Sequence, residues 1–304
     1  MNELCRNFLW GNSDLKFKPP LVSWDKVCTG KKNGGLGIFS ASLWNTAAAL
    51  RTIWYIHTNK ESLWIKWIHG NYIKNRDIWS VNVKTGDSWV WKQVLKVRNK
   101  AMITWGGVDN LKKIISSCYY NSKVHLSDLY SVLSPATAEI SWFMTVWEKF
   151  RHPKHSFITW LAVQGKLLTQ DRLINRGIIQ VNKCYLCEGA NMESHSHLFF
   201  DCRFSNRIWN AIMDWLNFKW RASEWSVLLD WYNSRLKGKS ITQRIKRMAL
   251  STAVYTIWRE RNDRFFKGQS KSSDMLIKSI KVDILTILLN SQIPAEEKVW
   301  LSSL

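Results

Sequence analysis

The sequence predicts a mainly α-helical protein in which a small helical zinc-binding domain is flanked by further helical segments. Apolar residues recur at helical spacing in several stretches of the 304-residue chain, and one stretch places cysteines and a histidine at the spacing of a metal site. The composition, with 46% hydrophobic and 22% charged residues, is typical of globular proteins and argues against a disordered tail or a fibre.

The N-terminal third of the chain predicts three helices. Because Gly34, Gly35 and Gly37 have neither the Lys-Ser/Thr pair of a P-loop nor the spacing of a dinucleotide fingerprint, we interpret them as a tight turn before the first helix. Residues 61–70 and 89–99 predict two further helices. In the first of these helices, the residues at helical spacing that form one face are Leu43, Ala47, Leu50, Trp54 and His57. The third predicted helix and the residue that follows it contain basic residues without acidic neighbours: Lys92, Lys96, Arg98 and Lys100.

The middle of the chain predicts short elements with recognisable ends. Residues 120–133 are expected to form a short strand and then a helix with Ser127 as its N-cap. Pro153 should open the next helix. Thr169 and Gly177 are the expected N-cap and left-handed C-cap of a short helix that ends at Arg176. We expect a shared core from the apolar faces in this region, comprising Trp160, Leu161, Leu173 and Trp209.

The C-terminal part predicts three helices. Ser205 is the expected N-cap of the first, and residues 241–266 form the second and longest. Residues 268–273 have the composition of a linker before the last helix. The long helix is expected to bury the stripe Ile241, Ile245, Met248, Thr252, Tyr255 and Trp258. The last helix is expected to bury Ile277, Ile280, Ile284, Ile287 and Leu288.

The charge of the chain indicates a polyanionic partner. Lys and Arg number 44 against 23 Asp and Glu, which gives a net charge of +21, and nucleic acid is the commonest polyanion that such a balance fits. The chain also has 20 Trp, which build cores and stack on bases. Six basic residues of the long helix are candidates for phosphate contacts without sequence preference: Arg244, Lys246, Arg247, Arg259, Arg261 and Arg264. The alternative is a solvated basic face with no ligand.

Four residues have the spacing of a zinc site. Cys184 and Cys187 form a Cys-x2-Cys pair, and His197 and Cys202 follow within 15 residues. A Cys3His set suits one structural zinc, which is tetrahedral and closed. His195 is an alternative ligand. The remaining cysteines of the chain stand alone in the sequence: Cys5, Cys28 and Cys118.

Three other interpretations of the cysteine cluster stay open. The Cys-x2-Cys pair could be a redox motif, although no strand-then-helix context surrounds it. The site could have lost its metal, or it could be an open catalytic zinc with Glu193 as the base. A fourth protein ligand and the absence of an H-x-E…P-C-x-x-C order argue against a catalytic zinc.

Residues 146–209 contain an ordered series of motifs: Trp147, Pro153 with Lys154, Phe157 with Trp160, Leu167 to Thr169, Arg176 with Gly177, Cys184 with Cys187, Glu193 to Phe199, Cys202 and Trp209. This series resembles the reverse transcriptase zinc-binding domain of plant LINE-type (non-LTR) retrotransposons. One element departs from the family, because His155 occupies the expected position of a Lys. The flanks of the chain resemble the segments that follow the polymerase and precede the RNase H domain in these elements.

This resemblance implies a division of the chain and a role. Residues 1–100 would be a post-polymerase, thumb-proximal remnant, residues 120–217 the zinc-binding domain, and residues 218–304 a basic helical C-terminal region. A polymerase palm needs a Tyr-x-Asp-Asp turn, and no Asp-Asp pair occurs in the sequence. We therefore expect a non-catalytic, zinc-stabilised fragment that binds RNA or DNA. A protein–protein interaction module and a non-functional retroelement remnant are the alternatives.

The sequence also predicts an intracellular protein of the nucleus or cytoplasm. The N-terminus has no basic region followed by an apolar one, so a secretory signal is not expected. No stretch reaches the roughly 18 consecutive apolar residues that a membrane helix needs, so no membrane association is expected. The oligomeric state leaves no signal in the sequence.

Overall fold

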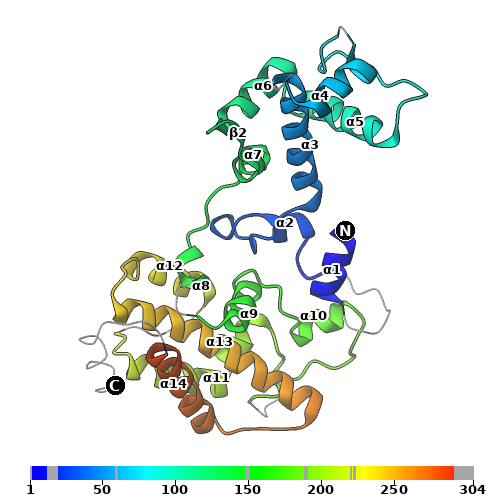
Figure 1. Cartoon of the computed structure of the whole chain (residues 1–304). Coiled ribbons are helices and arrows are strands. Elements are labelled where there is room, and N and C mark those ends of the chain that lie inside the picture. Colours follow the sequence, from blue (N-terminus) through cyan, green and yellow to red (C-terminus); the bar gives the residue numbers. More distant parts are fainter. Residues whose placement is uncertain are drawn as a thin grey trace. The chain divides into compact units, whose positions relative to one another are not determined.

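The computed structural model describes residues 2–11, 20–58, 61–74, 76–147, 151–187, 191–219, 221 and 224–290. Within these ranges the chain is mainly helical, as predicted (Figure 1). Two compact units are present: an N-terminal unit of residues 1–30 and 35–138, and a C-terminal unit of residues 31–34 and 139–304. The division into segments 1–100, 120–217 and 218–304 stays a prediction. No helix in the described ranges is long and apolar enough to cross a membrane.

The N-terminal unit is built around helix α3 (Ala41–Thr58). Helix α3 packs against α5 (Trp89–Thr104), α6 (Val108–Ser117) and α7 (Leu126–Leu133), and it buries Leu50 and Ile53 completely. The helices predicted from apolar spacing are therefore present, with longer bounds in the case of α5. The other elements of this unit are α1 (Asn2–Trp10), α2 (Trp24–Cys28), α4 (Leu63–Ile68), a π-helical turn (His69–Ile73), β1 (Tyr119–Tyr120) and β2 (Lys123–Val124).

The glycine-rich stretch forms the predicted tight turn. Gly34 and Gly37 have φ angles of 87° and 70°, a left-handed conformation that favours glycine. A Cβ atom on Gly35 would lie 2.1 Å from the carbonyl oxygen of Thr29, so no other residue fits there without a shift of the backbone.

The strand predicted within residues 120–133 is present as part of a small hairpin. The prediction that Ser127 is the N-cap of the helix after it is wrong. Strands β1 and β2 pair antiparallel across Asn121 and Ser122, which have φ angles of 49° and 60°, as a two-residue hairpin turn requires. Helix α7 then begins at Leu126 with His125 as its N-cap, because hairpin pairing ends just before it. The Ser127 hydroxyl contacts Asp128 instead, at 3.2 Å.

The C-terminal unit is built around the 27-residue helix α13 (Ile241–Lys267). Helix α13 packs against α8 (Phe143–Val146), α9 (Pro153–Val163), α11 (Arg203–Trp215) and α14 (Ser273–Leu289). The other described elements are a 3-10 turn (Lys31–Asn33), α10 (Gln170–Asn175), a π-helical turn (His197–Asp201) and α12 (Trp225–Arg235).

The predicted stripe of α13 is buried at Ile241, Ile245, Met248 and Thr252 and half-buried at Tyr255 and Trp258. The prediction that the other faces of α13 turn to solvent is wrong. Residues 247–254 are all buried, and eight consecutive residues cover the whole circumference of a helix. Partner helices on several sides are the physical reason. Arg247 is 1% exposed and donates hydrogen bonds to the carbonyl oxygens of Leu236 and Gly238.

The predicted helix starts near the cysteines are confirmed at Pro153, where α9 begins, and at Thr169, the N-cap of α10. Helix α10 ends at Asn175 with Arg176 as its C-cap, and the predicted left-handed residue Gly177, with a φ angle of 66°, follows directly. The predicted N-cap Ser205 is wrong, because the N-cap of α11 is Cys202, three residues earlier. The buried Ser205 hydroxyl donates to the carbonyl oxygen of Leu198 at 2.6 Å.

The predicted core around the cysteines is confirmed. Trp160, Leu161, Leu173 and Trp209 are all buried. The indole N–H of Trp160 donates to the carbonyl oxygen of Gly34 at 2.9 Å, and that of Trp209 to the carbonyl oxygen of Phe199 at 2.7 Å. Each large side chain thus adds apolar burial without leaving its polar atom unpaired. In α14, Leu276 rather than Ile277 joins Ile280, Ile284 and Leu288 in the buried face.

Helix α9 also buries a neutral histidine, which predicts a pH-dependent stability. His155 is 6% exposed, and its ring stacks on Tyr255 with centroids 4.3 Å apart. Burial, and then repulsion by His152 and Arg259, lowers the pKa of His155 from 6.5 to about 4. Between these two values the unfolded chain binds a proton that the folded chain does not, so acidification favours unfolding.

We expect the His155 contribution to lower the free energy of unfolding as the pH falls from 6.5 to 4, by at most about 3 kcal/mol, and to vanish above pH 6.5. Urea unfolding of the native chain and of His155→Phe, measured across this range, isolates the effect, because loss of metal in acid is common to both. The variant should show the shallower pH dependence. Identical profiles would contradict the expectation.

Candidate metal centre

Four predicted ligands come together in the C-terminal unit. Cys184 and Cys187 lie in the loop after α10, His197 begins the π-helical turn, and Cys202 directly precedes α11. One ligand atom from each of the four lies within 4.8 Å of all the others. The sulfur atoms of Cys184 and Cys202 are 3.9 Å apart, and the Cys187 sulfur is 3.5 Å from Nε2 of His197.

These distances and donor types fit a tetrahedral zinc. With Zn–S bonds of about 2.3 Å, two sulfur ligands of a tetrahedron are about 3.8 Å apart. Three thiolates and one imidazole are donors that zinc accepts well. Four protein donors complete a tetrahedron, which is the arrangement of a closed structural site rather than of a catalytic site with an open position.

Backbone amides around the cluster favour thiolates, and burial opposes them. The hydrogen bond with Cys184 has the largest effect on Cys202 and lowers its pKa; burial raises this pKa, and the amides of Ser205 and Phe204 lower it. The same hydrogen bond and burial raise the pKa of Cys184, against the amides of Cys187 and Leu186. Because zinc binds cysteine as the thiolate, zinc binding at these two buried cysteines is expected to release protons from the site.

His197 rather than His195 belongs to the cluster. The ring of His195 stacks on Trp225 with centroids 5.4 Å apart and contacts Phe199 edge-on. Burial lowers the pKa of His195, so its imidazole is held neutral in this aromatic cluster. The backbone amide of His197 donates to the Ser194 hydroxyl at 3.0 Å, which fixes the start of the turn that carries the ligand.

Comparison with known families agrees with this geometry. Residues 125–209 match a family model described as zinc-binding in reverse transcriptase. This segment is a reverse-transcriptase zinc-binding domain. All four ligands lie within it, and its Cys3His cluster indicates one zinc.

The chain was also compared with curated proteins and with solved structures. A stretch of 64 residues is 44% identical to the Arabidopsis thaliana protein named "Putative ribonuclease H protein At1g65750". That stretch covers 21% of this chain and only 10% of the relative, so the chain matches a small part of that protein. No solved structure matches the chain.

A buried ion pair joins the zinc-binding domain to α13. The carboxylate of Glu193, which is fully buried, accepts hydrogen bonds from Arg261 at 2.6 to 3.0 Å and from the backbone amide of Gln170 at 2.9 Å. Glu193 therefore satisfies the first amide of α10 and pairs with a residue beyond the matched segment. Because both charges are engaged and buried, Glu193 is not placed to act as a base at the metal.

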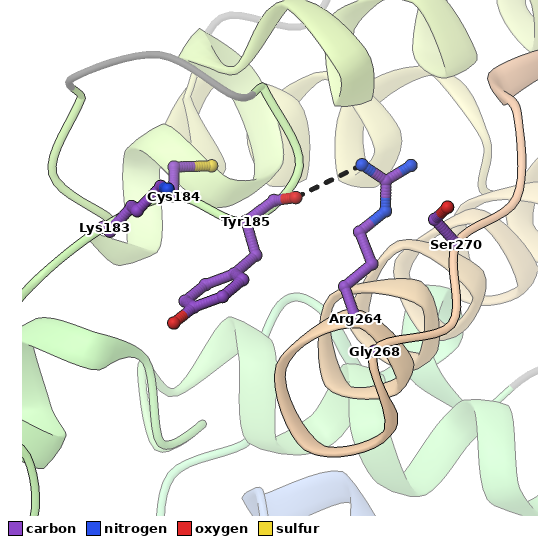
Figure 2. A pocket seen from close by; sticks show the side chains of 6 residues that line it. All are labelled: Lys183, Cys184, Tyr185, Arg264, Gly268 and Ser270. Atoms are coloured by element: carbon purple, nitrogen blue, oxygen red, sulfur yellow. Dashed lines mark hydrogen bonds between the residues drawn. The ribbon is translucent and has the colours of Figure 1, made fainter.

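A second arginine of α13 holds the turn that contains Cys184 and Cys187. Arg264 donates to the carbonyl oxygens of Tyr185 and Leu186, both at 3.2 Å, and to the Glu260 carboxylate at 2.8 Å. Figure 2 shows Arg264 directed at the Tyr185 carbonyl across a pocket of about 260 Å³. The pocket is lined by Lys183, Cys184, Tyr185, Arg264, Gly268 and Ser270.

The structure corrects the predicted phosphate contacts on α13. Arg247 and Arg261 are each 1% exposed, so neither is available to a phosphate. Arg264 is occupied by the bonds described above. Arg244 and Lys246 are half-buried, and Arg259 alone among the six predicted residues is exposed.

Sequence reasoning missed the structural role of these arginines, although one signal was available. Arg261 follows Ile257 by four residues and Val254 by seven, which places all three on one helix face. Since Val254 and Ile257 are apolar, this spacing predicts a buried arginine that needs a partner. Nothing in the spacing identifies Glu193 as that partner.

The cluster predicts one zinc per chain. Replacing Cys187 by Ser removes one of four donors and is expected to abolish stoichiometric binding, measured by metal analysis after dialysis. His197→Ala should also lose zinc, whereas the matched control His195→Ala should retain it. A Cys187→Ser protein that keeps one full equivalent would contradict the assignment.

The ion pair predicts a large cost for removing one partner. Glu193→Gln leaves the Arg261 charge buried and incompletely paired, and the expected loss is about 3–5 kcal/mol in the free energy of unfolding. Urea unfolding of the zinc-loaded protein measures it. The control is Asp274→Asn, which breaks the exposed pair with Arg207 and should cost about 1 kcal/mol or less. Equal effects of the two substitutions would argue against this role for Glu193.

Proposed function

We propose that this chain is a non-catalytic, zinc-stabilised nucleic-acid-binding part of a plant LINE-type retrotransposon reverse transcriptase protein. The observation that carries the proposal is the net charge of +21 on a chain that contains a reverse-transcriptase zinc-binding domain. A protein in such a setting meets RNA and DNA, and an excess of Lys and Arg favours phosphate contacts without sequence choice. The zinc would act on folding rather than on chemistry.

Two features support a role without catalysis. Four protein donors at the metal centre leave no position for a water or a substrate. The candidate base Glu193 already accepts hydrogen bonds from Arg261 and Gln170. Nucleic-acid binding is therefore the proposed activity of the chain itself.

The burial of the α13 arginines moves the proposed contact surface to other residues. Lys183 precedes the first zinc ligand, and Lys271 follows Ser270; both side chains are exposed. Lys183 and Ser270 line the same pocket beside the Cys-x2-Cys turn (Figure 2), and Lys271 is the next residue after Ser270 in the chain. The zinc-binding loop would hold such cations in position for a phosphate backbone.

Binding to nucleic acid should depend strongly on salt. For duplex DNA, the logarithm of the association constant is expected to fall with the logarithm of salt concentration by about 0.9 per phosphate contact, and by about 0.7 for single strands. Lys183→Gln with Lys271→Gln should flatten the duplex slope by about 1.8 if each lysine makes one contact. Fluorescence anisotropy with labelled RNA and DNA oligonucleotides between 50 and 200 mM salt measures both quantities.

The matched control removes two exposed lysines of the N-terminal unit, Lys113 and Lys123. This control should change the slope less than the Lys183 and Lys271 pair does. The absence of binding to every nucleic acid, or binding that ignores salt, would contradict the proposal and favour a protein-interaction module.

A further inference from the structure

The described part of the N-terminal unit has three exposed tryptophans, which are not part of the candidate metal centre. Trp64 is 51% exposed, Trp67 56% and Trp89 73%. Tryptophan is highly buried on average, because its side chain is the largest apolar one. Trp64 and Trp67 lie on α4, and Trp89 is the first residue of α5. Figure 1 shows these two helices.

The local structure directs these rings outward. Helix α4 buries Ile65 and Ile68, so the two tryptophans take its opposite side, together with the exposed Leu63. Trp64 and Trp67 are three residues apart and are therefore neighbours on the helix surface. The apolar pattern of α4 leaves the larger side chains outside the core.

Tyr72 connects the α4 tryptophans to the start of α5. Its ring contacts Trp67 edge-on with centroids 5.7 Å apart, and it stacks on the buried Trp91 at 4.8 Å. The Tyr72 hydroxyl donates to the Ser88 hydroxyl at 3.2 Å, and Ser88 is the N-cap residue directly before Trp89. The three exposed tryptophans, together with Tyr72, are hereafter called the aromatic surface.

The segment that carries the aromatic surface has an excess of cations. Residues 61–105 contain eight Lys and Arg against three acids. Each acid already has a local partner: Glu61 pairs with Lys66 at 3.0 Å, Asp77 lies 3.5 Å from His57, and Asp87 accepts from the backbone amide of Lys84 at 2.7 Å. Exposed cations in this segment include Lys74, Arg76, Lys84, Lys96 and Lys100.

We propose that the aromatic surface is a stacking site for single-stranded nucleic acid. This inference rests on the proposed function and names where and in what form the nucleic acid binds. Unpaired bases expose faces that stack on tryptophan, whereas a duplex hides them. Lysine is depleted at protein–protein interfaces, so the cation excess of the segment that carries these rings favours a polyanion over a protein partner. Stacking of this kind is tolerant of sequence, since every base has a π-face.

The test is the triple substitution of Trp64, Trp67 and Trp89 by Ala. Its affinity for labelled 20-nucleotide dT and rU strands, measured by fluorescence anisotropy, is expected to fall about tenfold or more, because each stacked base contributes several-fold. Affinity for a duplex of equal length should stay within about twofold. The triple substitution by Phe, which keeps the aromatic faces, should retain most of the single-strand affinity.

A matched control removes an exposed aromatic ring elsewhere. Phe266 on α13 is 70% exposed, and Phe266→Ala should leave single-strand affinity unchanged. Circular dichroism and zinc stoichiometry confirm that each variant folds, and the substituted side chains lie outside the core.

Three outcomes would overturn the inference. Salt-dependent binding that is equal in the native protein and the triple Ala variant would overturn the stacking site and leave the proposed function standing. No binding of the native protein to any strand or duplex would overturn both. Unchanged oligonucleotide affinity together with a loss of self-association in sedimentation would assign the surface to a second copy of the chain.

Discussion

Three thiols and an imidazole gathered within 4.8 Å of one another are the constraint on which the C-terminal unit depends. Two of the sulfur atoms are in buried residues, and a buried thiolate is stable only beside a cation or hydrogen-bond donors. The described residues between 178 and 194 form no helix or strand. Single hydrogen bonds, such as that from the Cys184 amide to the Asn191 carbonyl oxygen, hold this loop, and zinc coordination would add to them.

Two arginines of α13 also hold the loop in place, although both were predicted from the sequence to contact phosphates at the surface. Arg261 neutralises the buried carboxylate of Glu193, and Arg264 satisfies two carbonyl oxygens between Cys184 and Cys187. Such groups would be costly to bury without partners. Helix α13 lies beyond the segment that matches the family, so the zinc-binding domain packs on structure outside its own sequence bounds.

The basic residues of this protein are therefore not all available to a ligand. Some are structural: Arg98 of the N-terminal unit, which is 2% exposed, donates to the carbonyl oxygens of Ile78 and Val81, much as Arg247 does in α13. Burial lowers the pKa of Arg98, and the negative charge of Asp77 offsets part of that shift. The net charge therefore overstates the number of cations available to a ligand, and the proposed contacts rest on exposed residues such as Lys183.

The sequence by itself determined the features that depend on near neighbours. Helices with strong apolar spacing, the ends marked by Pro153 and Gly177, and the four zinc ligands all follow from patterns shorter than about 20 residues. Only the tertiary structure decided which group pairs with a buried arginine, because the partner of Arg261 lies 68 residues away. It also decided the helix starts at Leu126 and Arg203, where a hairpin and a zinc ligand set the backbone and override the local preference of serine for the N-cap. A charged side chain favours water unless a partner distant in sequence is placed beside it, and no local pattern encodes that placement.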